Sequence, residues 1–219
     1  ICSRRKRSYD PLQESRSPEG DHIPMFLARL ASTTPEAWTA LESSLAKYGR
    51  GAGLFEDVVV RRFGKSDSAP FQLRVRLAGQ QKEANIVDVG YGVSQVLPIL
   101  VEALAEQSPA MFLLQQPEVH LHPRAQAELG SFFATLVRER HHRFIIETHS
   151  DYIVDRVRMA VRDGALPRSA VSLLFLTSGG GSTEVQALAL DDDGNIQSAP
   201  PNYRDFFLKE ELRLLMAGA

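Results

Sequence analysis

Two short apolar segments, each followed at once by polar residues, constrain the fold most strongly. The segments "MFLLQQPE" (111–118) and "RFIIETHS" (143–150) both begin as buried strands, and the helical pattern "PRAQAELGSFFATLVRER" (123–140) lies between them. Strands that alternate with helices favour a parallel sheet, because a parallel connection needs a crossover that covers one face. The sequence therefore predicts an α/β fold with a mostly parallel sheet and flanking helices.

The composition is that of a globular chain. Its 219 residues are 43% hydrophobic and 24% charged, and the net charge of −2 gives no global basic field for nucleic acid. The single cysteine, Cys2, excludes an internal disulfide and fits a reducing compartment. No apolar run approaches the ~20 residues of a membrane span. We therefore expect a cytoplasmic protein that makes no membrane contact.

The residues before position 84 differ in pattern from those after it. Residues 8–24 are rich in Pro, Ser and charge and are typical of a loop. Residues 33–49 predict a helix that Thr34 caps and Gly49 ends. The remaining expected elements are strands at 55–63, 71–77 and 84–89, a helix at 92–107, a strand at 111–115, a helix at 123–140, a strand at 143–149, a helix at 150–164, strands at 170–178 and 182–190, and an amphipathic helix at 203–217.

Three segments have the composition of a phosphate site. In nucleotide hydrolases an apolar strand ends in an acid that holds Mg²⁺, as "MFLLQQPE" would if Gln115 were acidic. In "DVGYGVSQVLPIL" (88–100), Gly90 and Gly92 precede a helix whose first N–H groups suit an anion. His149 follows a strand and opens a helix, within reach of a terminal phosphate. Taken singly, the first segment is equally a buried strand with an ordinary turn, and for the other two an ordinary turn or a capped helix start is the favoured interpretation.

Together the three segments resemble the C-terminal half of an ABC-type ATPase head. The order "DVGYGVSQ", "LLQQPEVHLHP", "ETHSD" is similar to the SMC-like and OLD-like branch, and most of all to bacterial predicted AAA ATPases. The resemblance covers 84–216, and more loosely 9–83. It implies the C-terminal lobe of a P-loop ATPase head, with a terminal β-hairpin and helix. It divides the chain into an insertion or lid region (1–83), the lobe itself (84–178) and an extension (179–219).

The resemblance also implies a role for each matching position. Gln115 stands at the Mg²⁺ position, Gln116 at the position of the catalytic glutamate, and His149 at the switch histidine. Glu118, His120 and His122 fall in the D-loop region. The signature segment, which would face the terminal phosphate of a nucleotide held by an opposing subunit, comprises Gly90, Tyr91, Gly92, Val93, Ser94 and Gln95.

Two departures from the family pattern stand out. Gln115 lacks the carboxylate that neutralises Mg²⁺, so it is either an engineered replacement of glutamate or the mark of a naturally weak hydrolase; we favour the engineered reading. Glu118 is a nearby carboxylate that compensates in part or, in the reading we favour, holds the D-loop. No G-x-x-x-x-G-K-[ST] phosphate loop occurs anywhere in the 219 residues. Since Ile1 is not an initiating Met, we expect the Walker A half in a preceding segment or a separate chain.

The implied function is an ATPase subunit that uses ATP and Mg²⁺ and forms a homodimer or higher oligomer around ATP. By family analogy it would be the sensor or motor of a bacterial anti-phage or toxin–antitoxin module with an effector protein. The chain alone would be inactive. The alternative is a catalytically degenerate nucleotide-binding scaffold that recruits an effector.

Three further interpretations remain open. His120, His122, His141 and His142 could hold zinc, although no cysteine pair accompanies them. Asp191 and Asp193 could serve a nuclease, although "DDDGN" has the composition of a turn. The basic "RRKR" (4–7) is weak support for nucleic-acid contact.

Overall fold

The computed structural model describes Ser17, residues 20–66, 69–179 and 181–197, and the short stretches 199–200, 203–204, 209, 212–213 and 215–216. The chain forms two compact units, residues 1–157 and residues 158–219. Each unit is described separately below.

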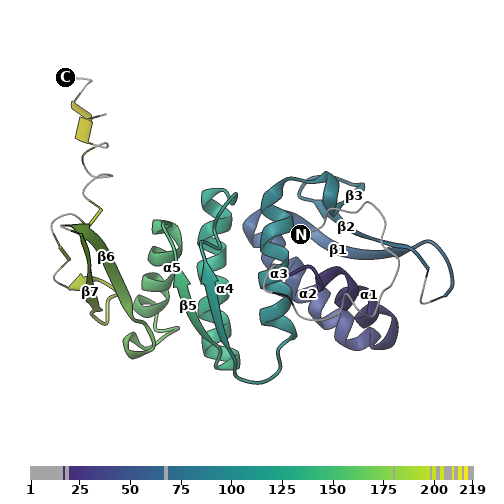
Figure 1. The fold of residues 1–219 in the computed structure, drawn as a ribbon, viewed down its shortest axis with the longest axis horizontal. Helices are drawn as coiled ribbons and strands as arrows, with labels where there is room; N and C mark the ends of the chain where they lie inside the picture. The colour runs from purple at the N-terminus through teal and green to yellow at the C-terminus, as the bar shows by residue number, and fades with distance from the viewer. Residues whose placement is uncertain are drawn as a thin grey trace. The chain divides into compact units, whose positions relative to one another are not determined.

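The first unit begins with two helices that pack beside an antiparallel sheet (Figure 1). The helices are α1 (Ile23–Thr33) and α2 (Pro35–Ala52), and the strands β1 (Phe55–Arg62), β2 (Phe71–Leu77) and β3 (Glu83–Asn85) pair in the order β1-β2-β3. The predicted strands at 55–63 and 71–77 are confirmed. Helix α1 was not predicted, because the loop composition before it gave no sign of its apolar start.

The end of α2 corrects one expectation. The helix runs past Gly49 to Ala52, and Gly53 ends it with a left-handed backbone (φ +71°). Gly49 has a different purpose, because a Cβ there would lie 2.4 Å from the ring of Phe55. The glycine therefore allows α2 and β1 to pack closely rather than stopping the helix.

The second half of this unit alternates helices and strands as predicted. It contains the 3₁₀ turn η2 (Ile86–Asp88), α3 (Tyr91–Ala105), β4 (Met111–Gln115), α4 (Pro123–Arg140), β5 (Arg143–Glu147) and α5 (Asp151–Arg162), whose last turns belong to the second unit. Strands β4 and β5 are parallel, with Met111 opposite Arg143 and Gln115 opposite Glu147. The strand predicted at 84–89 is shorter than expected, since Asn85 caps η2 through its side-chain oxygen.

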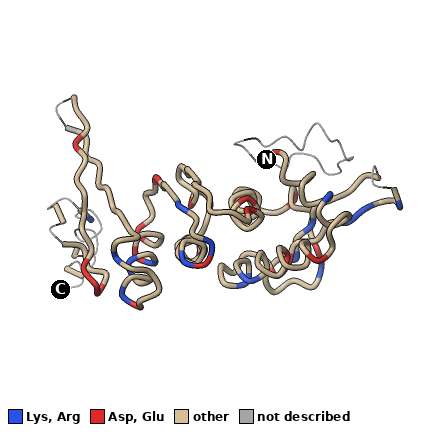
Figure 2. The backbone as a smooth tube through the Cα atoms, turned by 90° about the horizontal axis from the view of Figure 1, so that it is seen from below, with Lys and Arg blue, Asp and Glu red and all other residues tan. Residues whose placement is uncertain are grey.

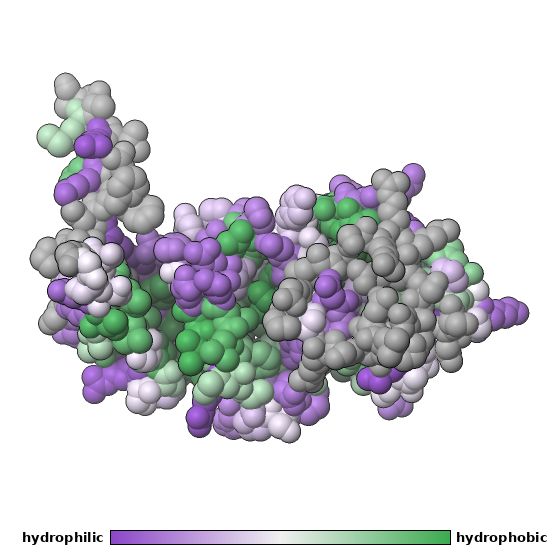
Figure 3. Space-filling view, viewed as in Figure 1, coloured by the Kyte–Doolittle hydropathy of each residue, from purple (hydrophilic) through white to green (hydrophobic). Residues whose placement is uncertain are grey.

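The two faces of the β4–β5 pair have different surroundings. On one face Phe112 stacks on Phe144 at 5.3 Å between ring centroids, and both pack against the main core that contains Phe133. On the other face Leu113 is 74% exposed and Ile145 is 58% exposed. Figure 3 shows this face as an apolar area over the two strands. We call the side chains of Met111, Leu113 and Ile145 the open face.

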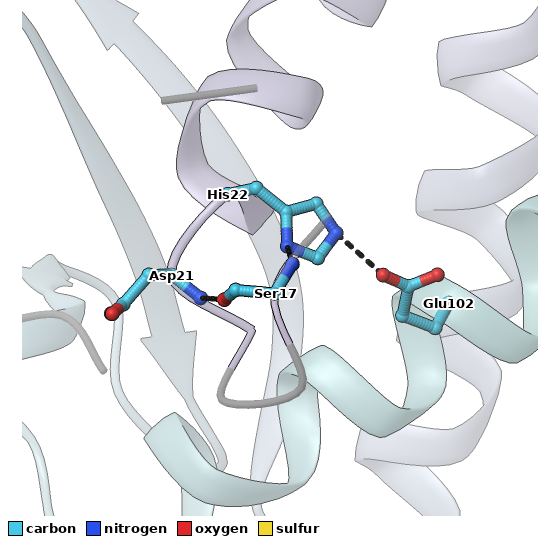
Figure 4. A network of polar contacts seen from close by, with 4 residues as sticks. All are labelled: Ser17, Asp21, His22 and Glu102. Carbon is cyan, nitrogen blue, oxygen red and sulfur yellow. Dashed lines mark hydrogen bonds and ion pairs between the residues drawn. The ribbon is translucent and has the colours of Figure 1, made fainter. Parts of the chain in front are cut away.

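The segment before α1 is attached to α3 through the hydrogen bonds of His22 with Ser17 and Glu102, which we call the clasp. His22 is buried, and its Nε2 lies 2.5 Å from Glu102 Oε1 on α3, while its Nδ1 accepts a hydrogen bond from the backbone of Ser17 (Figure 4). Nδ1 must be unprotonated to accept, so Nε2 carries the proton and donates to Glu102. Gly20 approaches Pro98 so closely that a Cβ would meet the proline at 2.6 Å.

The second unit contains an antiparallel hairpin. Strand β6 (Leu173–Gly179) pairs with β7 (Ser182–Leu190), and the short β8 (Ile196–Gln197) pairs with β7. The predicted hairpin is therefore confirmed, and β8 is an addition. Most of the predicted helix at 203–217 and the whole "RRKR" segment lie outside the described residues.

The described surface carries charges of both signs. Figure 2 shows Lys and Arg interspersed with Asp and Glu along the helices of the first unit. Within the described part of the chain, none of the helices has the length and hydropathy to span a membrane.

The clasp predicts a measurable loss of stability. Replacing Glu102 by Ala leaves the buried Nε2–H of His22 without its acceptor, so we expect the free energy of unfolding to fall by about 1–3 kcal/mol. Urea denaturation measures the change. The exposed Glu139, which forms a surface ion pair with its neighbour Arg138, provides the control, since Glu139→Ala should stay within about 0.5 kcal/mol of the parent. Equal losses for the two variants would contradict the role of the clasp.

Candidate functional site

The carboxyl ends of β4 and β5 lie at the same edge of their sheet. Gln115 pairs in register with Glu147, and the backbone N–H of Gln116 donates to the Glu147 carbonyl at 2.8 Å, one residue beyond β4. Gln116 has a positive φ of 44°, which turns the chain sharply out of the strand. The structure therefore brings Gln115 and Gln116 beside the segment that leads to His149.

Glu147 is a candidate that the sequence reasoning missed. It lies opposite Gln115 on the neighbouring parallel strand, and both residues occupy exposed positions in the strand alternation. Residues paired in this way present their side chains on the same face of a sheet. A carboxylate thus accompanies the Gln115 amide at the sheet edge. Only the register between the two strands reveals it, because 31 positions of sequence separate them.

Glu118 connects the loop after β4 to the candidate switch histidine. The residue is only 7% exposed, and its Oε1 accepts a hydrogen bond of 2.8 Å from the backbone N–H of His149. Its Oε2 is buried and has no hydrogen-bond partner among the described residues. Glu118 therefore fixes the position of the His149 backbone, a contact that the sequence could not show.

A second set of hydrogen bonds, formed by Gln126, lies next to the bond between Glu118 and His149. Gln126 on α4 donates from Nε2 to the Leu121 carbonyl at 2.8 Å and accepts at Oε1 from the Ser150 hydroxyl at 2.7 Å. The Ser150 hydroxyl also accepts from the backbone N–H of Ile153 at 3.2 Å, and so caps α5. Sequence reasoning gave Gln126 no role, since a glutamine on a helix carries no distinctive signal.

The histidines of the 116–122 loop have separate surroundings. His120 has a left-handed backbone (φ +65°), and its ring centroid lies 5.6 Å from that of Tyr91. His122 caps α4, since its Nδ1 accepts from the backbone N–H of Ala125 at 3.4 Å. Tyr91 itself is 75% exposed at the start of α3.

The signature segment forms the first turns of α3, and its two glycines differ. Gly90 has an ordinary φ of −60°, and a Cβ there would meet nothing within 4 Å. A Cβ on Gly92 would lie 2.8 Å from the His120 carbonyl oxygen, so close contact with the 116–122 loop requires this glycine. Val93 is buried in the core, whereas the Ser94 hydroxyl donates to the Tyr91 carbonyl. Gln95 is half-buried one position further along the helix.

The zinc interpretation finds no support among the described residues. No group of three or more His, Cys, Asp or Glu side chains there has a metal-binding arrangement. Both ring nitrogens of the buried His142 lie against backbone groups, at 3.2 Å from Ala110 N and 3.1 Å from the Ala103 carbonyl. His141 ends α4 with a left-handed backbone.

Comparisons with known proteins place this arrangement in a family. Residues 2–155 match the family model described as "AAA domain, putative AbiEii toxin, Type IV TA system". That is more than half of the chain. The chain belongs to this AAA family. A search of curated proteins found no match.

Solved structures with a similar fold include proteins from SMC ATPases. One, from work on ATP-driven dimerization and DNA-stimulated activation of SMC ATPases, is 14% identical with a TM-score of 0.53, over 85% of this chain and 97% of that one. The Smc head of Pyrococcus furiosus, bound to the C-terminal domain of ScpA, is 12% identical (TM-score 0.52; 91% and 44%). The Smc head of Pyrococcus yayanosii is 15% identical (TM-score 0.53; 84% and 30%). The present chain therefore spans less than half the length of each of these two Pyrococcus chains. Its fold is the α/β fold of such ATPase heads.

Asp191, of the acidic segment "DDDGN", has a structural role in a turn. Asp191 Oδ1 accepts from the backbone N–H groups of Asn195 (2.7 Å) and Asp193 (3.0 Å), and Oδ2 accepts from the side-chain amides of Asn195 and Gln197. These hydrogen bonds, that of the Asn195 backbone foremost, hold the pKa of Asp191 below its ordinary value. The carboxylate therefore organises the turn between β7 and β8.

This turn predicts a pH-dependent effect. A folded-state pKa below the unfolded value stabilises the fold above the unfolded pKa, and the contribution is lost as the pH falls through the folded pKa. Asp191→Asn should therefore lower the melting temperature at pH 7, and the deficit should shrink below about pH 4. Thermal unfolding followed by circular dichroism at both pH values checks this. Asp193→Asn is the matched control, and a deficit of Asp191→Asn that does not change with pH would count against the assignment.

Proposed function

We propose that the chain is the C-terminal lobe of an ATP-binding and hydrolysing ABC-type ATPase head. One observation carries the proposal: Gln115 pairs with Glu147 at the carboxyl end of a parallel strand pair, and Gln116 and His149 follow the two strands at this edge. Ligands of α/β proteins bind at this edge, outside the carboxyl ends of the strands. The AAA family and the SMC-type fold agree with a nucleotide phosphate as that ligand.

The donor set at this edge fits Mg²⁺. Hard cations prefer oxygen ligands, and Mg²⁺ keeps several waters beside one or two carboxylates. Gln115 would offer a neutral carbonyl oxygen, and Glu147 would offer the negative charge that the amide lacks. Bound Mg²⁺ would neutralise charge on the phosphates. His149, fixed through its backbone, would present its ring to the terminal phosphate.

The exposure of the open face supports the proposal that a further layer of protein covers it. Strands of parallel sheets are covered on both faces, yet Leu113 and Ile145 are mostly exposed here. The 219 residues contain no phosphate loop. We propose that the half of the head that bears Walker A covers the open face, and that it belongs to the same or a separate chain. Two such heads would enclose ATP, each presenting its signature segment to the nucleotide of the other.

The family description supports a proposal for the wider role. That description names a putative AbiEii toxin and a type IV toxin–antitoxin system. We propose that the ATPase is the sensor or motor of a bacterial defence module that acts with an effector protein. A scaffold that binds nucleotide without hydrolysis is the second candidate, and the Gln115 amide is the observation that favours it.

Restoring the acid at position 115 separates the two candidates. In a complex of this chain with the Walker A half, Gln115→Glu should raise ATP turnover by tenfold or more, on the order of the effect of a cation-neutralising charge. Phosphate release measures turnover, and Gln107→Glu, at the exposed end of α3, is the control. If the Gln115→Glu complex assembles and turnover stays at background, the scaffold function is correct and the hydrolase is not.

The open face predicts the site of assembly. Leu113→Asp places a charge in the middle of the proposed contact, so we expect affinity for the Walker A half to drop by about tenfold or more. Because Leu113 is exposed, the circular dichroism spectrum of the isolated chain should not change. Leu174→Asp alters another mostly exposed leucine, in β6 of the second unit, and should leave the affinity unchanged. Analytical ultracentrifugation gives both affinities, and equal binding by Leu113→Asp and the parent would place the contact elsewhere.

A further inference from the structure

We propose that Gln126 is a positioning residue, which fixes the turn carrying His149 relative to the 116–122 loop. The inference rests on the proposed ATPase function and adds a residue to which the motifs of the sequence analysis give no role. The turn in question comprises residues 148–150, and Gln126 faces it from α4.

The hydrogen bonds of Gln126 admit one arrangement. The Leu121 carbonyl can only accept, so the amide NH₂ of Gln126 faces it and Oε1 faces Ser150. Because Gln126 Oε1 is also only an acceptor, the single proton of the Ser150 hydroxyl points to it, while Ser150 Oγ accepts from the Ile153 N–H. Glutamine meets both demands at once. A carboxylate would satisfy Ser150 and leave the Leu121 carbonyl opposed by negative charge.

The hydrogen bonds of Gln126 supplement the hydrogen bond of Glu118 to the same turn. Glu118 holds the backbone N–H of His149, and Gln126 holds the side chain of the next residue, Ser150. Two consecutive residues of the turn, His149 and Ser150, are therefore held by side chains of residues 118–126. Gln126 is also bonded to Leu121, near the end of the 116–122 loop, so we expect the loop and the turn to move together.

The opposite side of the 116–122 loop touches the signature segment. The ring of His120 lies beside that of Tyr91, and Gly92 leaves no room for a Cβ against the His120 carbonyl. A shift at the start of α3 is therefore transmitted to the loop, and through Gln126 to the His149 turn. In a head dimer, the group that senses the neighbouring nucleotide would thereby adjust the group that faces the head's own nucleotide.

The first test measures the turn in the 219-residue chain itself. Gln126→Met preserves the length of the side chain and removes both hydrogen bonds, whereas Gln126→Glu retains an acceptor for Ser150. Amide hydrogen exchange of residues 148–153 should accelerate on the order of tenfold in Gln126→Met, and less in Gln126→Glu. Gln81→Met, in an exposed turn, should leave exchange unchanged. Unaltered exchange of residues 148–153 in Gln126→Met, or an equal acceleration throughout β4 and β5, would overturn the inference.

The second test measures catalysis in the complex that contains the Walker A half. A displaced His149 impairs the chemical step more than binding, so Gln126→Met should lower kcat by about tenfold or more while KM for ATP stays constant. A rise in KM at constant kcat, or no kinetic change, would overturn the role. If neither the parent nor the Gln115→Glu complex hydrolyses ATP, the proposed function fails instead, and the exchange data still decide whether Gln126 holds the turn.

Discussion

The in-register parallel pairing of β4 with β5 fixes the place of the candidate catalytic groups. The pairing aligns Gln115 with Glu147, and the bond from the Gln116 N–H to the Glu147 carbonyl continues it by one residue. A slip of one residue would turn the side chains of a strand to the opposite face and separate the amide from the carboxylate. The apolar stack of Phe112 on Phe144 stabilises this register from the core side.

The sequence predicted the parts of the fold that depend on local pattern. Helix α4 has the bounds expected from its periodicity, and β4 has the predicted bounds of 111–115. The end of α2 was misjudged, because Gly49 serves close packing against Phe55, and no local pattern distinguishes that purpose from a helix stop. Local chemistry thus sufficed where neighbours along the chain decide the conformation.

The candidate site was predictable in position and less so in composition. The motif residues at 115, 116 and 149 were visible as polar groups that end buried strands. Glu147 and Gln126 were not, since their relevance comes from contacts with residues more than 20 positions away. The family match ends at residue 155, close to the boundary between the two units at 157, so the β6–β7 hairpin lies outside the part that the family describes.

The clasp between His22 and Glu102 has a mechanical consequence. Gly20 rests on Pro98 and His22 is bonded to Glu102, so two points one helical turn apart on α3 grip the segment that enters α1. Because there are two contacts, they oppose both rotation of that segment about α3 and sliding along it. We therefore expect a tilt of α3 at its exposed start to be accompanied by a movement of the segment that enters α1.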